Sequence, residues 1–136
     1  MAGTKISELP AATLPLTGSE LVPVVQGGVT YQTNASAFIR QSAPVTKTAN
    51  FIVGNNENFI VCDGSASITV TLPTASSWTG RIITVKTIKA FTVVSASSNV
   101  VPLNSSTAGT AILAGTIGKW ATLVSNGTNW IVMAAA

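Results

Sequence analysis

The sequence predicts an all-β protein in which an extended N-terminal arm precedes a compact antiparallel β-sandwich or β-prism-like domain. Three observations predict this class: β-branched residues dominate, breaks rich in glycine or asparagine recur about every 8–12 residues, and apolar residues do not recur at helical spacing. The exception is residues 34–41, where Thr33 or Asn34 can cap a short helix. A helix of this length persists only when it is packed against other structure.

Residues 1–41 are expected to form the arm, because they hold Pro10, Pro15 and Pro23, three of the six prolines of the chain. Proline favours extended and weakly paired backbone. Within the arm, two apolar runs at residues 20–25 and 29–33 flank a glycine pair, which predicts a β-hairpin with a tight turn. Pro23 has no N–H to donate, so its strand should lie at a sheet edge.

Residues 42–48 are expected to be a linker, and residues 49–136 a small β domain. Strands are predicted at residues 50–53, 58–62, 67–72, 81–88, 91–96, 110–114, 120–125 and 128–133. A two-residue Asn126-Gly127 turn would place Leu123 opposite Trp130. Neither side of this last hairpin is cleanly polar, so we expect the domain core to cover one side and a neighbouring chain the other.

The composition excludes several classes of function. The 136 residues are 46% hydrophobic and 8% charged, against about 25% charged in an ordinary soluble domain. The net charge of +3 is spread along the chain, so no nucleic-acid partner is expected. No apolar run is long enough for a transmembrane helix, and the start lacks the apolar core of a signal peptide, so we expect synthesis in the cytoplasm and no membrane partner.

The residues needed for common catalytic chemistry are scarce. The chain has no histidine, which excludes imidazole acid–base catalysis and histidine-ligated metal, and we expect neither a metal nor a cofactor. A glycosidase needs two carboxylates at one cleft. Of the four acids, Glu57 and Asp63 are the pair close in sequence, and both stand where turns are expected, so a role in turn geometry or solubility is favoured.

The cysteine and the tryptophans are read mainly as structural. Cys62 lies in an apolar run and is expected to be a buried, inert thiol. Trp120 and Trp130 lie in the predicted last hairpin, where packing explains them better than a sugar-binding platform does. Trp78, in a loop at residues 76–80, is less well explained and is a candidate for an interface or glycan contact.

Two runs in the arm carry a family resemblance. Residues 5–12, KISELPAA, and residues 16–30, LTGSELVPVVQGGVT, resemble the N-terminal module of many tailed-bacteriophage tail fibre, tail spike and related virion proteins. The remainder, from Asn50 to the run VSNGTNW at residues 124–130, is similar to the small β domains that accompany this module. The first 30 residues are the specific part of the resemblance.

The resemblance implies a non-enzymatic virion protein, made in the cytoplasm of the host bacterium and generally homotrimeric. Its N-terminal region would dock onto other phage structural proteins of the tail or the capsid. The residues that the resemblance assigns to particle attachment are Lys5, Ile6, Leu9, Pro10, Leu21, Val22, Pro23, Val24 and Val25.

The sequence leaves the place in the virion open. A tail fibre-like or tail accessory subunit is favoured because the module is most familiar on tails. The short chain also fits a capsid decoration protein, such as a cement protein or a head fibre. A host carbohydrate-binding module with Trp78 at its site is the alternative from another class, and an enzyme is the least favoured.

Overall fold

The computed structural model describes residues 21–35 and 43–136 of the chain. The chain divides into two compact units, Met1–Arg40 and Gln41–Ala136. The expected attachment residues Lys5, Ile6, Leu9 and Pro10 lie outside the described residues, and so do residues 36–41 of the predicted helix. Within the described ranges, no helix is long and apolar enough to cross a membrane.

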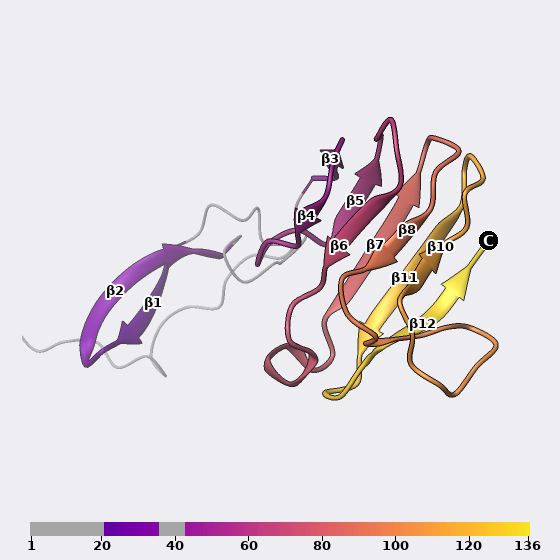
Figure 1. The fold of residues 1–136 in the computed structure, drawn as a ribbon. Helices are drawn as coiled ribbons and strands as arrows, with labels where there is room; N and C mark the ends of the chain where they lie inside the picture. The colour runs from indigo at the N-terminus through magenta and orange to yellow at the C-terminus, as the bar shows by residue number, and fades with distance from the viewer. Residues whose placement is uncertain (1–20, 36–42) are drawn as a thin grey trace, which may run out of the picture. The chain divides into compact units, whose positions relative to one another are not determined.

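The N-terminal unit contains the predicted hairpin. Strands β1 (Leu21–Gln26) and β2 (Val29–Asn34) form a two-stranded antiparallel sheet (Figure 1). The two residues of the turn, Gly27 and Gly28, have φ of 59° and 78°. Positive φ at both central positions is the type I′ geometry that matches the twist of the flanking strands, so the glycine pair explains both the turn and its length.

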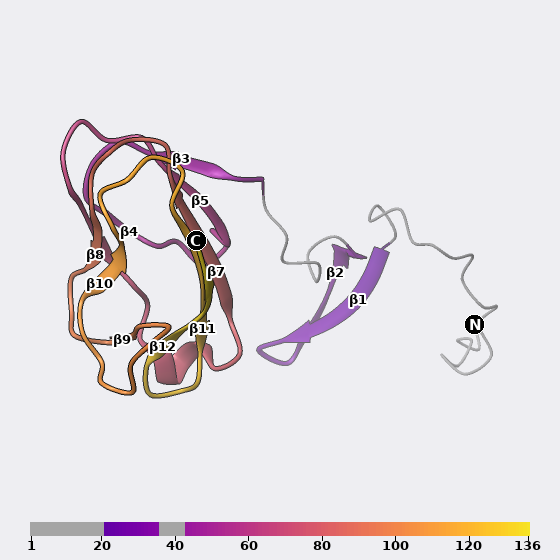
Figure 2. The same ribbon diagram turned by 90° about the vertical axis from the view of Figure 1, so that its right-hand side faces the viewer.

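The second unit is a sandwich of two sheets, which Figure 2 shows edge-on. The four-stranded sheet has the order β10-β8-β6-β4 and the six-stranded sheet the order β3-β5-β7-β11-β12-β9. The strands of the smaller sheet are β4 (Phe51–Ile52), β6 (Ile68–Thr71), β8 (Val93–Ser95) and β10 (Ala111–Leu113). Those of the larger sheet are β3 (Val45–Lys47), β5 (Phe59–Cys62), β7 (Ile82–Thr87), β9 (Val100–Val101), β11 (Trp120–Ser125) and β12 (Trp130–Ala135).

The chain changes sheet after every strand from β3 to β10. In the first half, strands two apart in sequence run side by side in the same direction, and β3–β5, β5–β7, β4–β6 and β6–β8 are all parallel pairs. The antiparallel pairs β8–β10, β7–β11 and β11–β12 follow later in the chain. The all-β class and the sandwich are confirmed, but the prediction of an antiparallel domain is wrong for its first half and for the pair β9–β12, which is also parallel.

The predicted linker is wrong at residues 45–47, which form β3 at the edge of the larger sheet. The short strand β9 and a 3₁₀ helix, η3 (Ala75–Trp78), were also not predicted. These elements have two to four residues each, too few for a hydrophobic period to be read. Their conformation is determined by the strands beside them, which the local sequence does not specify.

The core lies between the two sheets and consists of the alternate, inward-facing residues of both. Seventeen buried apolar residues form one cluster, and Ile83, Val85, Leu123 and Trp130 within it are fully buried. Polar groups in the core have partners: Ser125 Oγ donates to the carbonyl of Ala75 at 2.8 Å, and Trp130 Nε1 donates to the carbonyl of Pro73 at 2.9 Å. Both bonds tie the loop around η3 to the larger sheet.

The last hairpin has the predicted faces but a different register. Ser125 pairs with Trp130 and Leu123 with Val132, so the pairing is displaced by two residues from the prediction. The cause is Asn126, whose side-chain oxygen accepts hydrogen bonds from the backbone N–H groups of Thr128 and Asn129 at 2.9 and 2.8 Å. This cap makes a four-residue loop. Because side chains alternate with a period of two, the displacement leaves Leu123 and Trp130 on the inner face.

Substitution of a central core residue tests the inside–outside assignment. Ile83→Ala removes a fully buried side chain and should lower the free energy of unfolding by about 2–5 kcal/mol. The matched control, Ile52→Ala on β4, removes the same atoms from a side chain that is 72% exposed and should change stability by less than about 0.5 kcal/mol. Denaturant unfolding measures both, and equal losses would contradict the assignment.

Candidate interaction surfaces

The two faces of the N-terminal hairpin differ in how their apolar residues are distributed between the strands. The register β1–β2 places Val22, Val24, Val29 and Tyr31 on one face together with Gln26 and Thr33, and we call this the apolar face of the hairpin. Tyr31 is 53% exposed and lies directly opposite Val24. A two-stranded hairpin is marginally stable in water by itself, so an apolar face of this kind is a candidate contact with another protein.

The opposite face is mixed. Its β1 half carries Leu21, Pro23 and Val25, and its β2 half carries three polar side chains, those of Thr30, Gln32 and Asn34. Leu21 and Val25 are 61% and 73% exposed. The five predicted attachment residues at positions 21–25 therefore divide between both faces of β1 and do not form one patch.

The outer edge of β2 has a more complete row of backbone hydrogen-bond donors than the outer edge of β1. Hydrogen-bonded and non-hydrogen-bonded pairs alternate from the Gln26–Val29 pair next to the turn, which places the Pro23–Gln32 pair among the non-hydrogen-bonded ones. The ring nitrogen of Pro23 then faces the outer edge of β1, where it interrupts the row of donors. An added strand would therefore find an uninterrupted row of backbone donors on β2, and the prediction of Pro23 on an edge strand is confirmed.

The larger sheet of the second unit turns its outer side away from the core. Strand register aligns the side chains of this side in three rows across neighbouring strands, which together we call the outer sheet face. The rows are Ile82–Val124–Ile131–Val101, Phe59–Thr84–Thr122–Ala134 and Thr46–Val61–Lys86–Trp120. Most of these side chains are apolar, and Ile82, at 55% exposed, is the most open of the first row.

The outer sheet face has four polar side chains, and two of them pair with each other. In its central row the hydroxyls of Thr84 and Thr122 lie 3.2 Å apart and hydrogen-bond to each other. Lys86, in a flanking row, is the one charged residue among the twelve. The outer side of the smaller sheet is shorter, because its registered residues are Ile52 beside Thr71 and the row Thr69, Val94 and Ala111.

Trp78 lies at the end of η3 and packs against the core cluster. The guanidinium carbon of Arg81 lies 4.4 Å from the centre of its ring, which is a cation–π contact. A sugar could stack only on the part of the Trp78 ring that Arg81 and the core do not cover. The geometry therefore explains Trp78 structurally, and a role in binding remains a prediction.

The other two tryptophans do not form a platform. Trp130 is fully buried in the core, whereas Trp120 belongs to the outer sheet face, beside Lys86 in the register of β7 and β11. The two rings therefore lie on opposite sides of the larger sheet. Packing accounts for Trp130, as the sequence predicts, and its ring lies in the core between the two sheets.

The carboxylates near β5 are separated and engaged in different contacts. Glu57 precedes β5 and its Oε1 accepts a hydrogen bond from Lys47 Nζ at 2.6 Å. Asp63 follows β5 and its Oδ1 lies 3.4 Å from Lys89 Nζ. The structure therefore does not bring these two carboxylates together at one cleft, and Glu57 has the turn position that the sequence predicts.

Glu57 is the centre of a cluster that joins β3, the turn at residues 54–57 and the start of β7. Its Oε2 accepts from the backbone N–H of Gly54 at 2.9 Å, and Arg81 Nη2 donates to the carbonyls of Gly54 and Glu57 at 2.6 and 3.0 Å. Burial raises the pKa of Glu57, but the hydrogen bonds from Lys47 and Gly54 and the charges of Lys47 and Arg81 outweigh it and lower that pKa below the ordinary 4.5.

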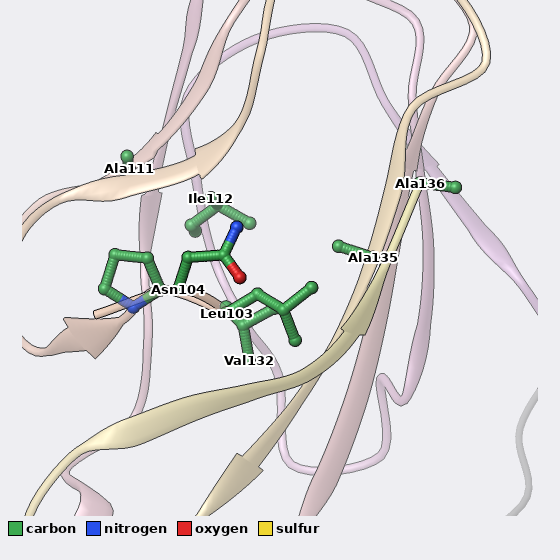
Figure 3. Close-up of a pocket in the computed structure, with 8 residues that line it drawn as sticks. Leu103, Asn104, Ala111, Ile112, Val132, Ala135 and Ala136 are labelled. Atoms are coloured by element: carbon green, nitrogen blue, oxygen red, sulfur yellow. The ribbon is translucent and has the colours of Figure 1, made fainter. Parts of the chain in front are cut away.

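A pocket of about 330 Å³ opens between the two sheets beside β10 and β12. Figure 3 shows its lining, which converges from the loop after β9, from β10 and from the end of β12: Pro102, Leu103, Asn104, Ala111, Ile112, Val132, Ala135 and Ala136. One side-chain amide, that of Asn104, stands among apolar groups. Small-molecule sites combine an apolar lining with several polar groups that point into the pocket. This pocket has one such side chain, so we interpret it as a gap in the packing at the end of the sandwich.

Sequence reasoning missed the continuity of the outer sheet face. Within β7 and β11, the outward positions other than Lys86 hold apolar or hydroxyl residues. The absence of a cleanly polar side in β11 and β12 was the signal available in the sequence. What the sequence could not provide is the strand order that places Ile82 beside Val124 and Val124 beside Ile131. The Lys47–Glu57–Arg81 cluster was missed because β3 was read as a linker.

Acidification should weaken the Glu57 cluster. A carboxyl whose pKa is lowered by folding contributes stability above its unfolded pKa, here about 4.5, and loses it as pH falls through the lower folded value. We expect Glu57→Gln to lower the unfolding free energy by about 1 kcal/mol at neutral pH and to flatten its decline below pH 4.5. Asp63→Asn, which removes a longer and more exposed pair, is the control and should cost less.

The thiol of Cys62 should be unreactive in the folded protein. Its side chain is buried, and this burial raises its pKa to about 11, so the thiolate is scarce near neutral pH. We expect an alkylating reagent at pH 8 to leave the native chain unlabelled over a time in which the denatured chain is fully labelled. Mass spectrometry measures the addition, and equal labelling rates would show that Cys62 is accessible.

No family model, no curated protein and no solved structure matches this chain. The candidate surfaces are accordingly defined by the residues and contacts of the chain itself.

Proposed function

We propose that the chain is a non-enzymatic structural subunit of a bacteriophage virion that docks on the particle through its N-terminal hairpin. In this proposal the subunit is a homotrimer and belongs to the tail, as a fibre-like or accessory protein. The partners are other structural proteins of the same particle. A capsid decoration protein is the alternative location for the same kind of subunit.

The observation that carries the attachment role is the polarity of the hairpin. Residues 21–35 contain no charged side chain, and the apolar face collects Val22, Val24, Val29 and Tyr31 from both strands. Such a ribbon gains stability when a partner covers this face or adds a strand to its edge. Charged residues are rare at the centres of protein interfaces, and this face of the hairpin has none.

The virion assignment has a separate support, which is the resemblance of residues 5–12 and 16–30 to the attachment module of phage tail proteins. The location within the particle is decided by copy number. Tens of copies or fewer per particle would favour the tail, and hundreds would favour the capsid surface. A particle image with this chain labelled provides that count and would contradict the proposal if no label were found on the virion.

A charge placed on the apolar face of the hairpin tests the attachment role. Val24→Lys puts an ammonium opposite Tyr31 and should reduce incorporation of the full chain into particles by at least about tenfold, because an unpaired charge is costly to bury. The control is Gln32→Lys, which adds the same charge to the mixed face of the same hairpin and should leave incorporation nearly unchanged. Quantitative immunoblotting of purified particles measures both.

The two variants separate the outcomes. Loss with Val24→Lys and retention with Gln32→Lys would support docking by the apolar face. Retention of both variants in particles at the level of the unsubstituted chain would contradict an attachment role for the hairpin. Loss of Gln32→Lys with retention of Val24→Lys would move the contact to the mixed face and overturn the assignment made here.

A further inference from the structure

We infer that the partner of the N-terminal hairpin is an exposed edge strand of another virion protein, and that this strand adds to the outer edge of β2. The inference deepens the proposed function, and rests on it, by naming the chemistry of the partner. Main-chain hydrogen bonds hold the added strand, and the apolar face of the hairpin continues the covered side of the partner's sheet. The hairpin thereby becomes part of a sheet of three or more strands, which is stable where two strands alone are marginal.

The register of the hairpin determines which backbone groups point to the outer edge of β2. The Gln26–Val29 pair flanks the two-residue turn and is hydrogen-bonded, and the two kinds of pair alternate from there along the strands. The residues of the non-hydrogen-bonded pairs direct their N–H and C=O groups outward. In β2 these residues are Thr30, Gln32 and Asn34, and all three are exposed. Within the part of the chain that the structure describes, no backbone group from outside the hairpin bonds to them.

The two edges of the hairpin are protected differently against an added strand. Natural sheets protect an exposed edge with proline, with charged side chains or with a bulge. The edge of β1 carries Pro23, whose ring occupies the place of an outward N–H. Strand β2 has no proline and no charged residue, and its register with β1 is unbroken. Because only the edge of β1 is protected, the edge of β2 is the one that a partner covers.

The symmetry of the proposed homotrimer argues against a second copy of this chain as the partner. Pairing of β2 with β2 of another copy joins two copies about a two-fold axis and leaves the third copy without a partner. Pairing of β2 with β1 of the next copy can repeat around a three-fold axis, but it places β2 against the edge that Pro23 interrupts. An edge strand of a different protein has neither restriction, so each of the three hairpins can bind one.

Proline substitutions on the two strands test the inference in the full-length chain. Gln32→Pro removes an outward N–H from the edge of β2, and Val25→Pro removes one from the edge of β1. Neither N–H bonds within the hairpin, so both variants should keep it. The nuclear Overhauser effect between the backbone N–H protons of Val24 and Tyr31, a hydrogen-bonded pair, checks this. Quantitative immunoblotting of purified particles measures incorporation, and sedimentation velocity measures the oligomeric state.

We expect Gln32→Pro to reduce incorporation by at least about tenfold, because the partner strand loses a donor and meets the proline ring. Val25→Pro should be incorporated as the unsubstituted chain is. Gln32→Lys keeps the N–H and should also be incorporated, so a loss with proline alone assigns the contact to the backbone. Thr30→Pro removes a second outward N–H from the same edge and should repeat the loss, which keeps the test decisive if Gln32→Pro opens the hairpin.

Full incorporation of Gln32→Pro and Thr30→Pro would overturn the addition of a strand to β2, and attachment by the apolar face would still stand if Val24→Lys is excluded from particles. Equal losses of Gln32→Pro and Val25→Pro with the hairpin intact would also overturn it, because the two edges would then not differ. Retention of Val24→Lys would instead contradict the proposed function itself. A changed oligomeric state of Gln32→Pro would show that the edge of β2 joins copies of this chain, and would overturn a different protein as the partner.

Discussion

The burial of one apolar layer between two sheets is the constraint on which the second unit depends. Each strand supplies alternate residues to that layer, and the chain crosses to the other sheet after each strand from β3 to β10. Because consecutive strands from β3 to β11 lie in opposite sheets and do not pair, their inward side chains pack against residues from the opposite sheet. The parallel pairs of the first half follow from this path, since the chain enters each sheet again in the same direction.

The outer side of the larger sheet departs from the pattern expected of such a layer. Alternation requires polar residues outside in a sheet that faces water, yet Ile82, Val124 and Ile131 form an apolar row there. The chain as a whole is only 8% charged, and several of its charges are engaged in holding the sandwich together. Lys47, Glu57 and Arg81 fasten β3 and the 54–57 turn to β7, so they are not available to solvate the sheet.

The residues that determined local geometry were readable in advance. Gly27 and Gly28 specify a tight hairpin because both positions need positive φ, and the buried state of Cys62 follows from the apolar run around it. Asn126 shows the limit of such reading. An Asn-Gly pair is typical of a two-residue turn, but the side chain of Asn126 caps a longer loop. The choice between the short and the longer loop depends on hydrogen bonds that form only in the folded hairpin.

The sequence by itself determined the all-β class and the approximate position of most strands, because both can be read from a few neighbouring residues. Only the tertiary structure decided which strands pair and in which direction. A glycine- or asparagine-rich break can connect two strands of one sheet or two strands of different sheets. Which of these forms is determined by contacts between residues distant in sequence, such as Val85 and Ile60. The outer sheet face, assembled from six strands, exists only once that choice has been made.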